Sequence, residues 1–213
     1  MEKADKHSLV IAGIGTDIGK TVVSAIFAEA LKAHYWKPVQ AGDLSFSDSM
    51  KVRAYCSDEV HVLPERYLLN TAVSPHLSAR LDGVVIDEHD FELPEVEGNL
   101  IIEGAGGLMV PLNDTGFLYI DLIKHWKLPV VLVSRHYLGS INHTLLSLEI
   151  LKQSGIAVHT IVFIGAPNEA SESVVLKRFP PERVIHIPLV DEVNAAFVRE
   201  QAEKVASMFS RED

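Results

Sequence analysis

Residues 11–33 read IAGIGTDIGKTVVSAIFAEALKA and place a Gly-Lys-Thr triplet between a short apolar run and a helical pattern. Such triplets are typical of phosphate-binding loops, in which glycines let backbone N–H groups converge on an anion at the start of a helix. In the general pattern G-x-x-x-x-G-K-[ST] the first glycine would stand where this chain has Ile14. The nearest preceding glycine is Gly13, so we predict a modified phosphate loop that is one residue longer than the general one.

Two side chains of this loop are candidates for the chemistry. Lys20 can reach the outer phosphates of a nucleotide, and the Thr21 hydroxyl can bind Mg²⁺. An ordinary strand-to-helix turn with a solvated lysine is the alternative, but the order of strand, glycine turn and helix favours the phosphate loop. The other residues expected to surround the phosphates are Gly15, Asp17, Ile18 and Gly19.

Short β-branched apolar runs alternate with stretches of helical spacing along the chain. The runs are typical of strands buried on both faces and cover residues 9–12, 99–102, 130–133, 160–164 and 184–187. Helical spacing recurs in residues 21–33, 116–126, 141–153 and 192–209. We therefore predict one α/β domain over residues 1–213, a doubly wound, mostly parallel sheet with helices on both faces, of the P-loop NTPase type. Residues 57–96 are expected to form short helices and loops.

The composition limits the partners and the compartment. The net charge is −10 and no cluster of lysines and arginines is visible, which argues against nucleic acid as a partner. No apolar run approaches the roughly 20 residues that span a bilayer, and the N-terminus lacks a signal-peptide pattern, so we expect no membrane association and no export. Cys56 is the single cysteine, and we expect a free, buried thiol in a reducing, cytoplasmic compartment.

Three charged side chains outside the loop are candidates for the same site. Lys37 follows a plausible second strand and precedes a proline, which stops any helix, so it could neutralise phosphate charge. Glu103 ends an apolar strand, where a carboxylate is costly unless it is paired or bound to metal, so a Mg²⁺ ligand is attractive. Asp48 follows soon after Lys37, and Asp43 competes with it for a metal role. Taken alone, Lys37 would be interpreted as a surface lysine, Glu103 as the cap of a turn and Asp48 as a helix N-cap.

A second helix start could bind an anion. Gly139 and Ser140 lead into a helix whose first amides are free donors, which suits a carboxylate or a phosphate. The alternative, a serine that only caps its helix, is at least as well supported by these residues alone. The ten histidines and the single cysteine show no metal-ligand spacing, so we expect no zinc or other transition-metal site.

In this order, the motifs resemble those of the dethiobiotin synthetase family, the ATP-dependent ligases of biotin biosynthesis. The resemblance runs from the first strand nearly to the last helix, and in that family the longer phosphate loop is normal. The matching pieces are Gly13-x-x-Thr16-Asp17-Ile18-Gly19-Lys20-Thr21, Lys37-Pro38-Val39, Ser74-Pro75-His76, Glu103-Gly104-Ala105-Gly106-Gly107, Leu128-Pro129-Val130, Leu138-Gly139-Ser140-Ile141-Asn142-His143 and Ile187-Pro188-Leu189.

The resemblance implies a ring closure that depends on ATP and Mg²⁺. Diaminopelargonic acid would take up CO₂ as a carbamate, ATP would activate the carbamate as a carbamic-phosphoric anhydride, and the second amine would close a cyclic urea. The catalytic residues would be Lys20, Lys37 and Thr16, and the Mg²⁺ ligands Thr21, Asp48 and Glu103. Pro188 and Leu189 would lie at the nucleotide. Ala41 would lie near the carbamate, and Gly139, Ser140, Ile141 and Asn142 would bind the substrate carboxylate across a homodimer interface.

Three positions depart from the family pattern. Ala41 stands where many relatives carry a hydroxyl residue, and Asp17 stands where glutamate is common. Ile164 occupies the position of an asparagine that reads the adenine edge, and an apolar side chain cannot offer that paired donor and acceptor. Either a residue near Pro188 and Glu192 reads the base, or selectivity for the nucleotide is relaxed.

Two other functions remain as alternatives. A P-loop switch protein of the partition or regulatory type would use the nucleotide to control dimerisation and partner binding. Such proteins usually carry a second lysine in a K-G-G-x-G-K-[ST] pattern, and this chain has Ala12, Gly13 and Ile14 before Gly15. The other alternative is a related amidoligase that acts on a larger acid, or an inactive relative.

Overall fold

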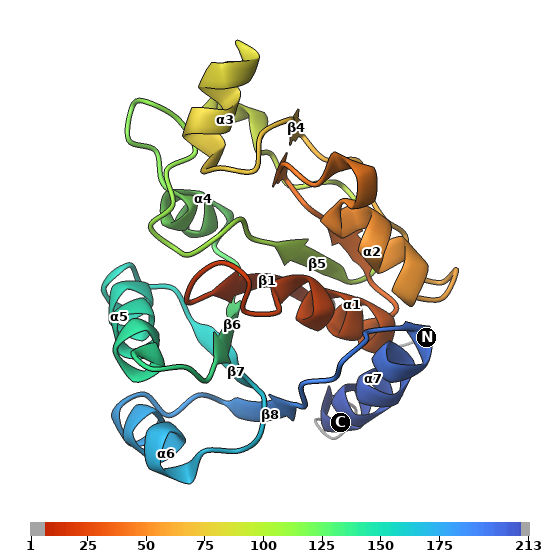
Figure 1. The fold of residues 1–213 in the computed structure, drawn as a ribbon, viewed down its shortest axis with the longest axis vertical. Helices are drawn as coiled ribbons and strands as arrows, with labels where there is room; N and C mark the ends of the chain where they lie inside the picture. Colours follow the sequence, from red (N-terminus) through yellow and green to blue (C-terminus); the bar gives the residue numbers. More distant parts are fainter. Residues whose placement is uncertain (1–6, 210–213) are drawn as a thin grey trace.

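A six-stranded parallel sheet forms the centre of the molecule (Figure 1). The computed structural model describes residues 7–209. In spatial order the strands are β2 (His34–Trp36), β5 (Leu100–Glu103), β1 (Ser8–Gly13), β6 (Val130–Arg135), β7 (Val158–Ile164) and β8 (Arg183–Ile187). The chain adds strands on both sides of β1, so the strand order changes direction there. In parallel sheets such a point leaves a crevice at the carboxyl ends of the strands, where ligands bind.

Helices cover both faces of the sheet, as predicted (Figure 1). One face carries α1 (Lys20–Leu31) and α7 (Ala195–Phe209), with α2 (Asp48–Tyr55) against α1. The other face carries α4 (Tyr119–Trp126), α5 (Ser140–Gln153) and α6 (Glu169–Arg178). Residues of β1 alternate between the two cores, because successive side chains of a strand point to opposite faces.

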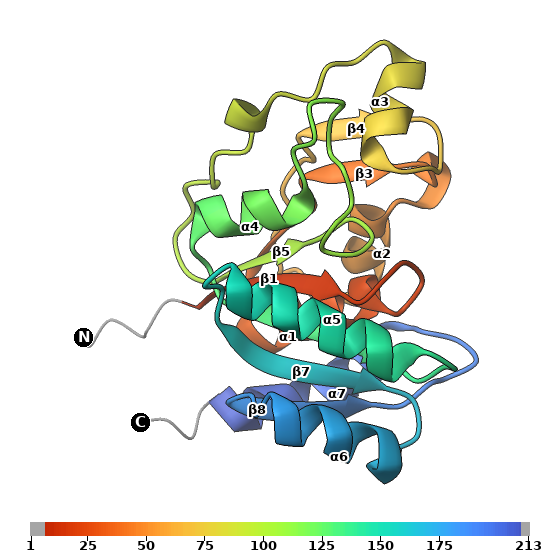
Figure 2. The same ribbon diagram turned by 90° about the vertical axis from the view of Figure 1, so that its left-hand side faces the viewer.

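A small second sheet lies beyond the β2 side of the main sheet (Figure 2). It pairs β3 (Val39–Ala41) with β4 (Tyr67–Leu69) in parallel, and α3 (Pro75–Asp82) packs on both strands. Two 3₁₀ turns, η1 (Leu44–Phe46) and η2 (Glu88–Asp90), complete this part. Since β3 begins two residues after Lys37, the small sheet and α2 hold the chain that follows this lysine.

The structure contains all five predicted strands and differs from the prediction at helix ends. The helix expected over 116–126 begins at Tyr119, because Leu112 and Phe117 close a loop before it and the Asn113 side chain accepts hydrogen bonds inside that loop. The last helix begins at Ala195 rather than 192, with the Asn194 side chain accepting from the Phe197 N–H.

Other differences concern short elements and the cysteine. Residues 57–96 contain the strand β4 as well as the expected short helices and loops, and α6 was not predicted. Cys56 is half-buried rather than buried, and burial, with Glu29 nearby, raises the pKa of its thiol to about 12. Within residues 7–209 no helix is both long and apolar enough to cross a membrane.

Candidate active site

The phosphate loop occupies the crevice between β5 and β6 at the carboxyl end of β1. Its residues 14–19 connect the last residue of β1, Gly13, to the first residue of α1, Lys20. A Cβ atom at Gly13 would lie 2.5 Å from the Cδ1 atom of Ile18, so a larger residue here would displace the Ile18 side chain. Gly19 has a φ of +96°, which favours glycine, and no side chain caps the helix that follows. The uncapped amides at the start of α1 are available to an anion.

Lys20 is buried inside this loop. Its Nζ atom donates a 2.6 Å hydrogen bond to the Gly15 carbonyl oxygen, and its side chain is 7% exposed. Burial, together with the positive charge of Lys37, lowers the pKa of Lys20 to about 8. A bound phosphate would reverse this shift, because an anion stabilises the charged ammonium.

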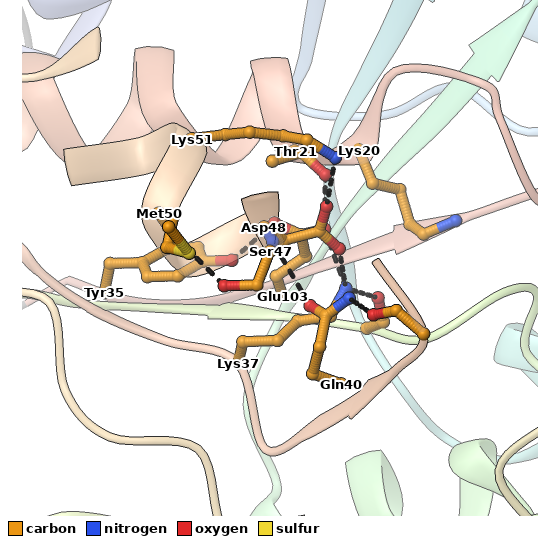
Figure 3. A network of polar contacts seen from close by, with 12 residues as sticks. Lys20, Thr21, Tyr35, Lys37, Gln40, Ser47, Asp48, Met50, Lys51 and Glu103 are labelled. Carbon is orange, nitrogen blue, oxygen red and sulfur yellow. Dashed lines mark hydrogen bonds and ion pairs between the residues drawn. The ribbon is translucent and has the colours of Figure 1, made fainter. Parts of the chain in front are cut away.

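Lys37 lies at the centre of a buried ionic network (Figure 3). Its Nζ atom is 2.8 Å from Oδ2 of Asp48 and 2.9 Å from Oε1 of Glu103, and it donates a 3.1 Å bond to the Gly104 carbonyl oxygen. Lys37 follows β2, Asp48 begins α2 and Glu103 ends β5, so three separate elements meet here. Lys37 and Glu103 are only 4% and 1% exposed.

The charges in this network stabilise one another. Burial alone would lower the pKa of Lys37, but the carboxylates of Glu103 and Asp48 outweigh it and raise the pKa above its usual value. Burial would raise the pKa of Asp48, but the ammonium groups of Lys37 and Lys51 hold it well below the usual range. Lys37 and Asp48 are therefore charged at neutral pH.

Three hydroxyl groups surround Glu103. Thr21 Oγ1 donates to Oε1 at 2.8 Å, and the Tyr35 hydroxyl donates to Oε2 at 2.8 Å. The Tyr119 hydroxyl donates to the backbone carbonyl oxygen of Glu103 at 3.3 Å. The first two bonds connect the start of α1 and strand β2 to the same carboxylate.

The oxygens of Thr21, Asp48 and Glu103 fit Mg²⁺. The two carboxylates converge on one ammonium group, and the Thr21 hydroxyl contacts one of them. Mg²⁺ in nucleotide sites takes one or two carboxylates together with phosphate and water oxygens. In the described part of the chain, no three or more His, Cys, Asp or Glu side chains are grouped as for a metal held by the protein alone. Asp43, the competing candidate, is exposed, whereas Asp48 faces the site.

A pocket of about 470 Å³ lies beside the phosphate loop. One wall is the loop itself, including Thr16 and Asp17, and the other is the segment that follows β6. The lining residues are Ile14, Gly15, Thr16, Asp17, Ile18, Arg135, His136, Tyr137 and His143. Thr16 and Asp17 are exposed, so their polar groups are accessible to a second substrate.

The predicted carboxylate-binding segment adjoins this pocket. Gly139, with a φ of +103°, is the N-cap residue of α5, and Ser140 is the first helical residue rather than the cap. No side chain caps this helix, so its first amides are free of side-chain partners. Ile141 and Asn142 are exposed. Ala41 ends β3 on the Lys37 side of the phosphate loop and is half-buried.

Ile164 belongs to the core rather than to an open base site. It ends β7, is 5% exposed, and its Cγ1 atom would lie 3.6 Å from a Cβ atom at Gly19. Pro188 and Leu189 follow β8 and are exposed. The accessible surface at this end of the loop therefore comes from the segments that follow β7 and β8.

Tyr35 was missed by the sequence reasoning. The residue was hidden in the run His34-Tyr35-Trp36, where an aromatic side chain indicates only a buried strand. The signal that could have found it is its spacing from Lys37, because residues two apart in an extended chain point to the same side.

Known proteins resemble this chain over most of its length. Residues 7–196 match the protein family described as AAA domain. The ATP-dependent dethiobiotin synthetase of Christiangramia forsetii is 50% identical over 201 residues, which cover 92% of this chain and 95% of the relative. That of Rhodopseudomonas palustris is 49% identical over 185 residues, covering 86% and 88%. The chain belongs to the dethiobiotin synthetase family. It is therefore an enzyme of this ligase family, as the motifs predicted.

Solved structures with low sequence identity share the fold. The cell division ATPase MinD of Pyrococcus furiosus superposes with a TM-score of 0.58 at 16% identity, covering 96% of this chain and 100% of that one. A ParA family ATPase of Chlorobium tepidum gives 0.53 at 14% identity, covering 95% and 99%. The predicted P-loop NTPase type of α/β fold is confirmed.

Proposed function

We propose that this protein is a dethiobiotin synthetase that uses ATP and Mg²⁺ to carboxylate diaminopelargonic acid with CO₂ and close the ring. The observation that supports this best is the ionic network around Lys37. It lies beside Lys20 and Thr21 of the phosphate loop in a chain that matches curated synthetases over about nine tenths of its length. The alternative of a partition switch is supported only by a shared fold with structures of low sequence identity.

The proposed chemistry has three steps. One amine of the substrate attacks CO₂ and loses a proton, which gives a carbamate. A carbamate oxygen attacks the γ-phosphorus of ATP, ADP leaves, and a carbamic-phosphoric anhydride forms. The second amine attacks the carbamoyl carbon, inorganic phosphate leaves with the C–O bonding electrons, and the amine proton is lost to give the cyclic urea.

The residues of this chain would position and neutralise the reactants. Lys20 and Lys37 carry charge toward the transferring phosphoryl group and the carbamate, and Thr16 lies at the loop surface beside the pocket. Phosphoryl transfer needs positioning and charge stabilisation rather than a protein nucleophile. Bound Mg²⁺ would neutralise the phosphate oxygens, and Thr21, Asp48 and Glu103 would hold it.

The carboxylate of the substrate would bind to the start of α5 in a homodimer. The amides after Gly139 have no side-chain cap, as an anion site requires. Large apolar side chains are exposed around this helix start, namely Tyr137, Leu138, Ile141 and Leu146. Apolar side chains gathered in this way are typical of surfaces covered by another chain.

The cytoplasmic location expected from the single cysteine stays a prediction.

The proposal is tested with purified protein, diaminopelargonic acid, bicarbonate and Mg-ATP. We expect the cleavage of ATP to ADP and phosphate to depend on the diamine and to yield the cyclic urea in equal amount, measured by phosphate release and mass spectrometry. Lys20→Ala should abolish phosphate release while circular dichroism stays unchanged. ATP turnover that ignores the diamine, or no turnover, would refute the proposed activity.

A further inference from the structure

Tyr35 is a buried hydroxyl residue that the proposed reaction does not yet use. It is the middle residue of β2, its side chain is fully buried, and its backbone pairs with the segment around Val62 as well as with β5. Both backbone partners hold the ring at a fixed depth in the sheet. Its hydroxyl reaches the carboxyl end of the neighbouring strand and donates to Oε2 of Glu103 at 2.8 Å.

The two oxygens of the Glu103 carboxylate have different partners. Oε1 accepts from Thr21 Oγ1 at 2.8 Å and Lys37 Nζ at 2.9 Å. Within residues 7–209, Oε2 accepts only from Tyr35. A carboxylate that is 1% exposed gains nothing from bulk water, so the loss of one donor leaves an oxygen unsatisfied.

This division of partners fixes how the carboxylate is turned. The two oxygens of a carboxylate are equivalent, so a half-turn about the last side-chain bond changes nothing, but an intermediate rotation would carry one oxygen away from Thr21 and Lys37. Terminal torsions of this kind are broad in the absence of other contacts. The bond from Tyr35 fixes the plane of the carboxylate, because the hydroxyl holds one oxygen on the side away from the phosphate loop while Thr21 holds the other (Figure 3).

We propose that Tyr35 is a positioning residue that holds the plane of the Glu103 carboxylate so that one oxygen faces Thr21 and Lys37, and so couples Mg²⁺ binding to nucleotide binding. The inference rests on the proposed function in one respect, the assignment of Glu103 as a Mg²⁺ ligand. Tyr35 itself touches neither the metal position nor the reactants. Its effect would pass through the carboxylate alone.

The structure offers a matched control in Tyr119. This tyrosine is also buried and its hydroxyl also contacts Glu103, but the acceptor is the backbone carbonyl oxygen at 3.3 Å. Tyr119→Phe removes the same atom from the same kind of environment without freeing the carboxylate. A merely structural role for the hydroxyl would therefore affect Tyr35→Phe and Tyr119→Phe alike.

The experiment measures the dissociation constant of an ATP analogue by calorimetry, with Mg²⁺ and with EDTA. The constant in EDTA divided by the constant in Mg²⁺ gives a ratio that reports how strongly the metal assists nucleotide binding. We expect Tyr35→Phe to lower this ratio about tenfold while the constant in EDTA stays within about twofold, because one hydrogen bond to a charged group is lost. Tyr119→Phe should keep the ratio of the unmodified protein. An unchanged ratio in Tyr35→Phe, or an equal fall in both variants, would overturn the inference.

Glu103→Gln gives a second test that does not need Tyr35→Phe to fold. The Lys37 ammonium can only donate and Thr21 donates beside it, so the amide oxygen should take the Oε1 position and the NH₂ group should face the Tyr35 hydroxyl, which then no longer donates to this side chain. This variant should lose the Mg²⁺ effect by at least about tenfold. A fall of less than twofold would contradict the inference. Adding Tyr35→Phe to Glu103→Gln should change the ratio no further, and an additive loss would show that Tyr35 does not act through this carboxylate.

None of these measurements uses the diamine or CO₂. A protein that fails to make the cyclic urea but shows the Tyr35-dependent ratio would refute the proposed function and leave the inference intact. A protein that makes the cyclic urea but shows an unchanged ratio in Tyr35→Phe would support the proposed function and overturn the inference.

Discussion

Lys37 Nζ lies between the buried carboxylate of Glu103 and the half-buried carboxylate of Asp48. Because one ammonium group contacts both, it occupies the position between them that a cation would share. A lysine on this site would separate from the carboxylates when the metal enters, and its charge would then be available to the phosphate and the carbamate. The desolvation cost of burying these charges is offset only when the network is complete, since a buried ion pair contributes little net stability by itself.

At the residue scale we expect Lys37→Met to lower the free energy of unfolding by about 3–5 kcal/mol, because it leaves the buried Glu103 carboxylate without its counter-charge and Asp48 with Lys51 alone. Mg²⁺ should raise the melting temperature of this variant more than that of the unmodified protein, since the metal replaces the lost ammonium. Thermal unfolding with and without Mg²⁺ measures both effects. The control is Lys51→Met, which removes a more exposed ammonium that pairs with Asp48 alone at 3.2 Å. Equal responses of Lys37→Met and Lys51→Met to Mg²⁺ would argue against this explanation.

Ile164 shows how a substitution at one residue changes meaning with its surroundings. Ile164 is a buried core residue, and its side chain packs against the phosphate loop at Gly19. Ile164→Asn should therefore lower the free energy of unfolding by about 1–3 kcal/mol by burying an amide that lacks partners. It should also leave the preference for ATP over GTP unchanged, as measured by competition binding. A gain in ATP preference without loss of stability would return Ile164 to the base site.

At the element scale, the Glu172 carboxylate of α6 contacts two histidines of the central sheet region. Glu172 accepts from the backbone N–H of Asn168 at 2.8 Å, and its two oxygens lie 2.9 Å and 2.7 Å from Nε2 of His136 and His186. The two imidazoles stack on either side of Phe163. The segment after β6 and strands β7 and β8 are thus joined to a helix that has few buried apolar residues of its own.

The Glu172 contacts predict a pH dependence with a definite sign. Burial would raise the pKa of Glu172, but the Asn168 amide and the two histidines outweigh it and lower the pKa below its usual value. A lowered pKa means that the stabilisation is present above the usual range for a glutamate and is lost as the pH falls through the lower value of the folded state. The stability difference between the unmodified protein and Glu172→Gln should therefore shrink on acidification, as measured by urea unfolding across the acid range. Glu169→Gln, on the exposed first turn of α6, should show no such trend.

At the scale of the whole molecule, the predictable parts of the fold are those with strong local signals. Parallel strands buried on both faces read as continuous apolar runs, so the sheet was predicted. Elements such as α6 and the three-residue strand β4 bury few apolar side chains and were missed. In the candidate site, the loop motif predicted Lys20 and Thr21, whereas the meeting of Lys37, Asp48 and Glu103 depends on the long-range order of strands. Tyr35 could not be found from composition, because an aromatic ring in a strand is usually core.

The last prediction concerns the assembly of two chains. Leu138 is fully exposed at the start of α5, beside the proposed carboxylate site, and Ile141 and Leu146 are exposed nearby. An apolar surface of this kind is costly in water and is typical of a covered interface. We expect the unmodified protein to be a dimer in light scattering and Leu138→Asp to shift toward the monomer with a loss of turnover, because a charge would be buried at the interface. Leu81→Asp, which places the same charge at an exposed leucine on α3, is the control and should stay dimeric and active. A dimeric and active Leu138→Asp would exclude this surface as the interface and would separate the carboxylate site from the assembly of the two chains.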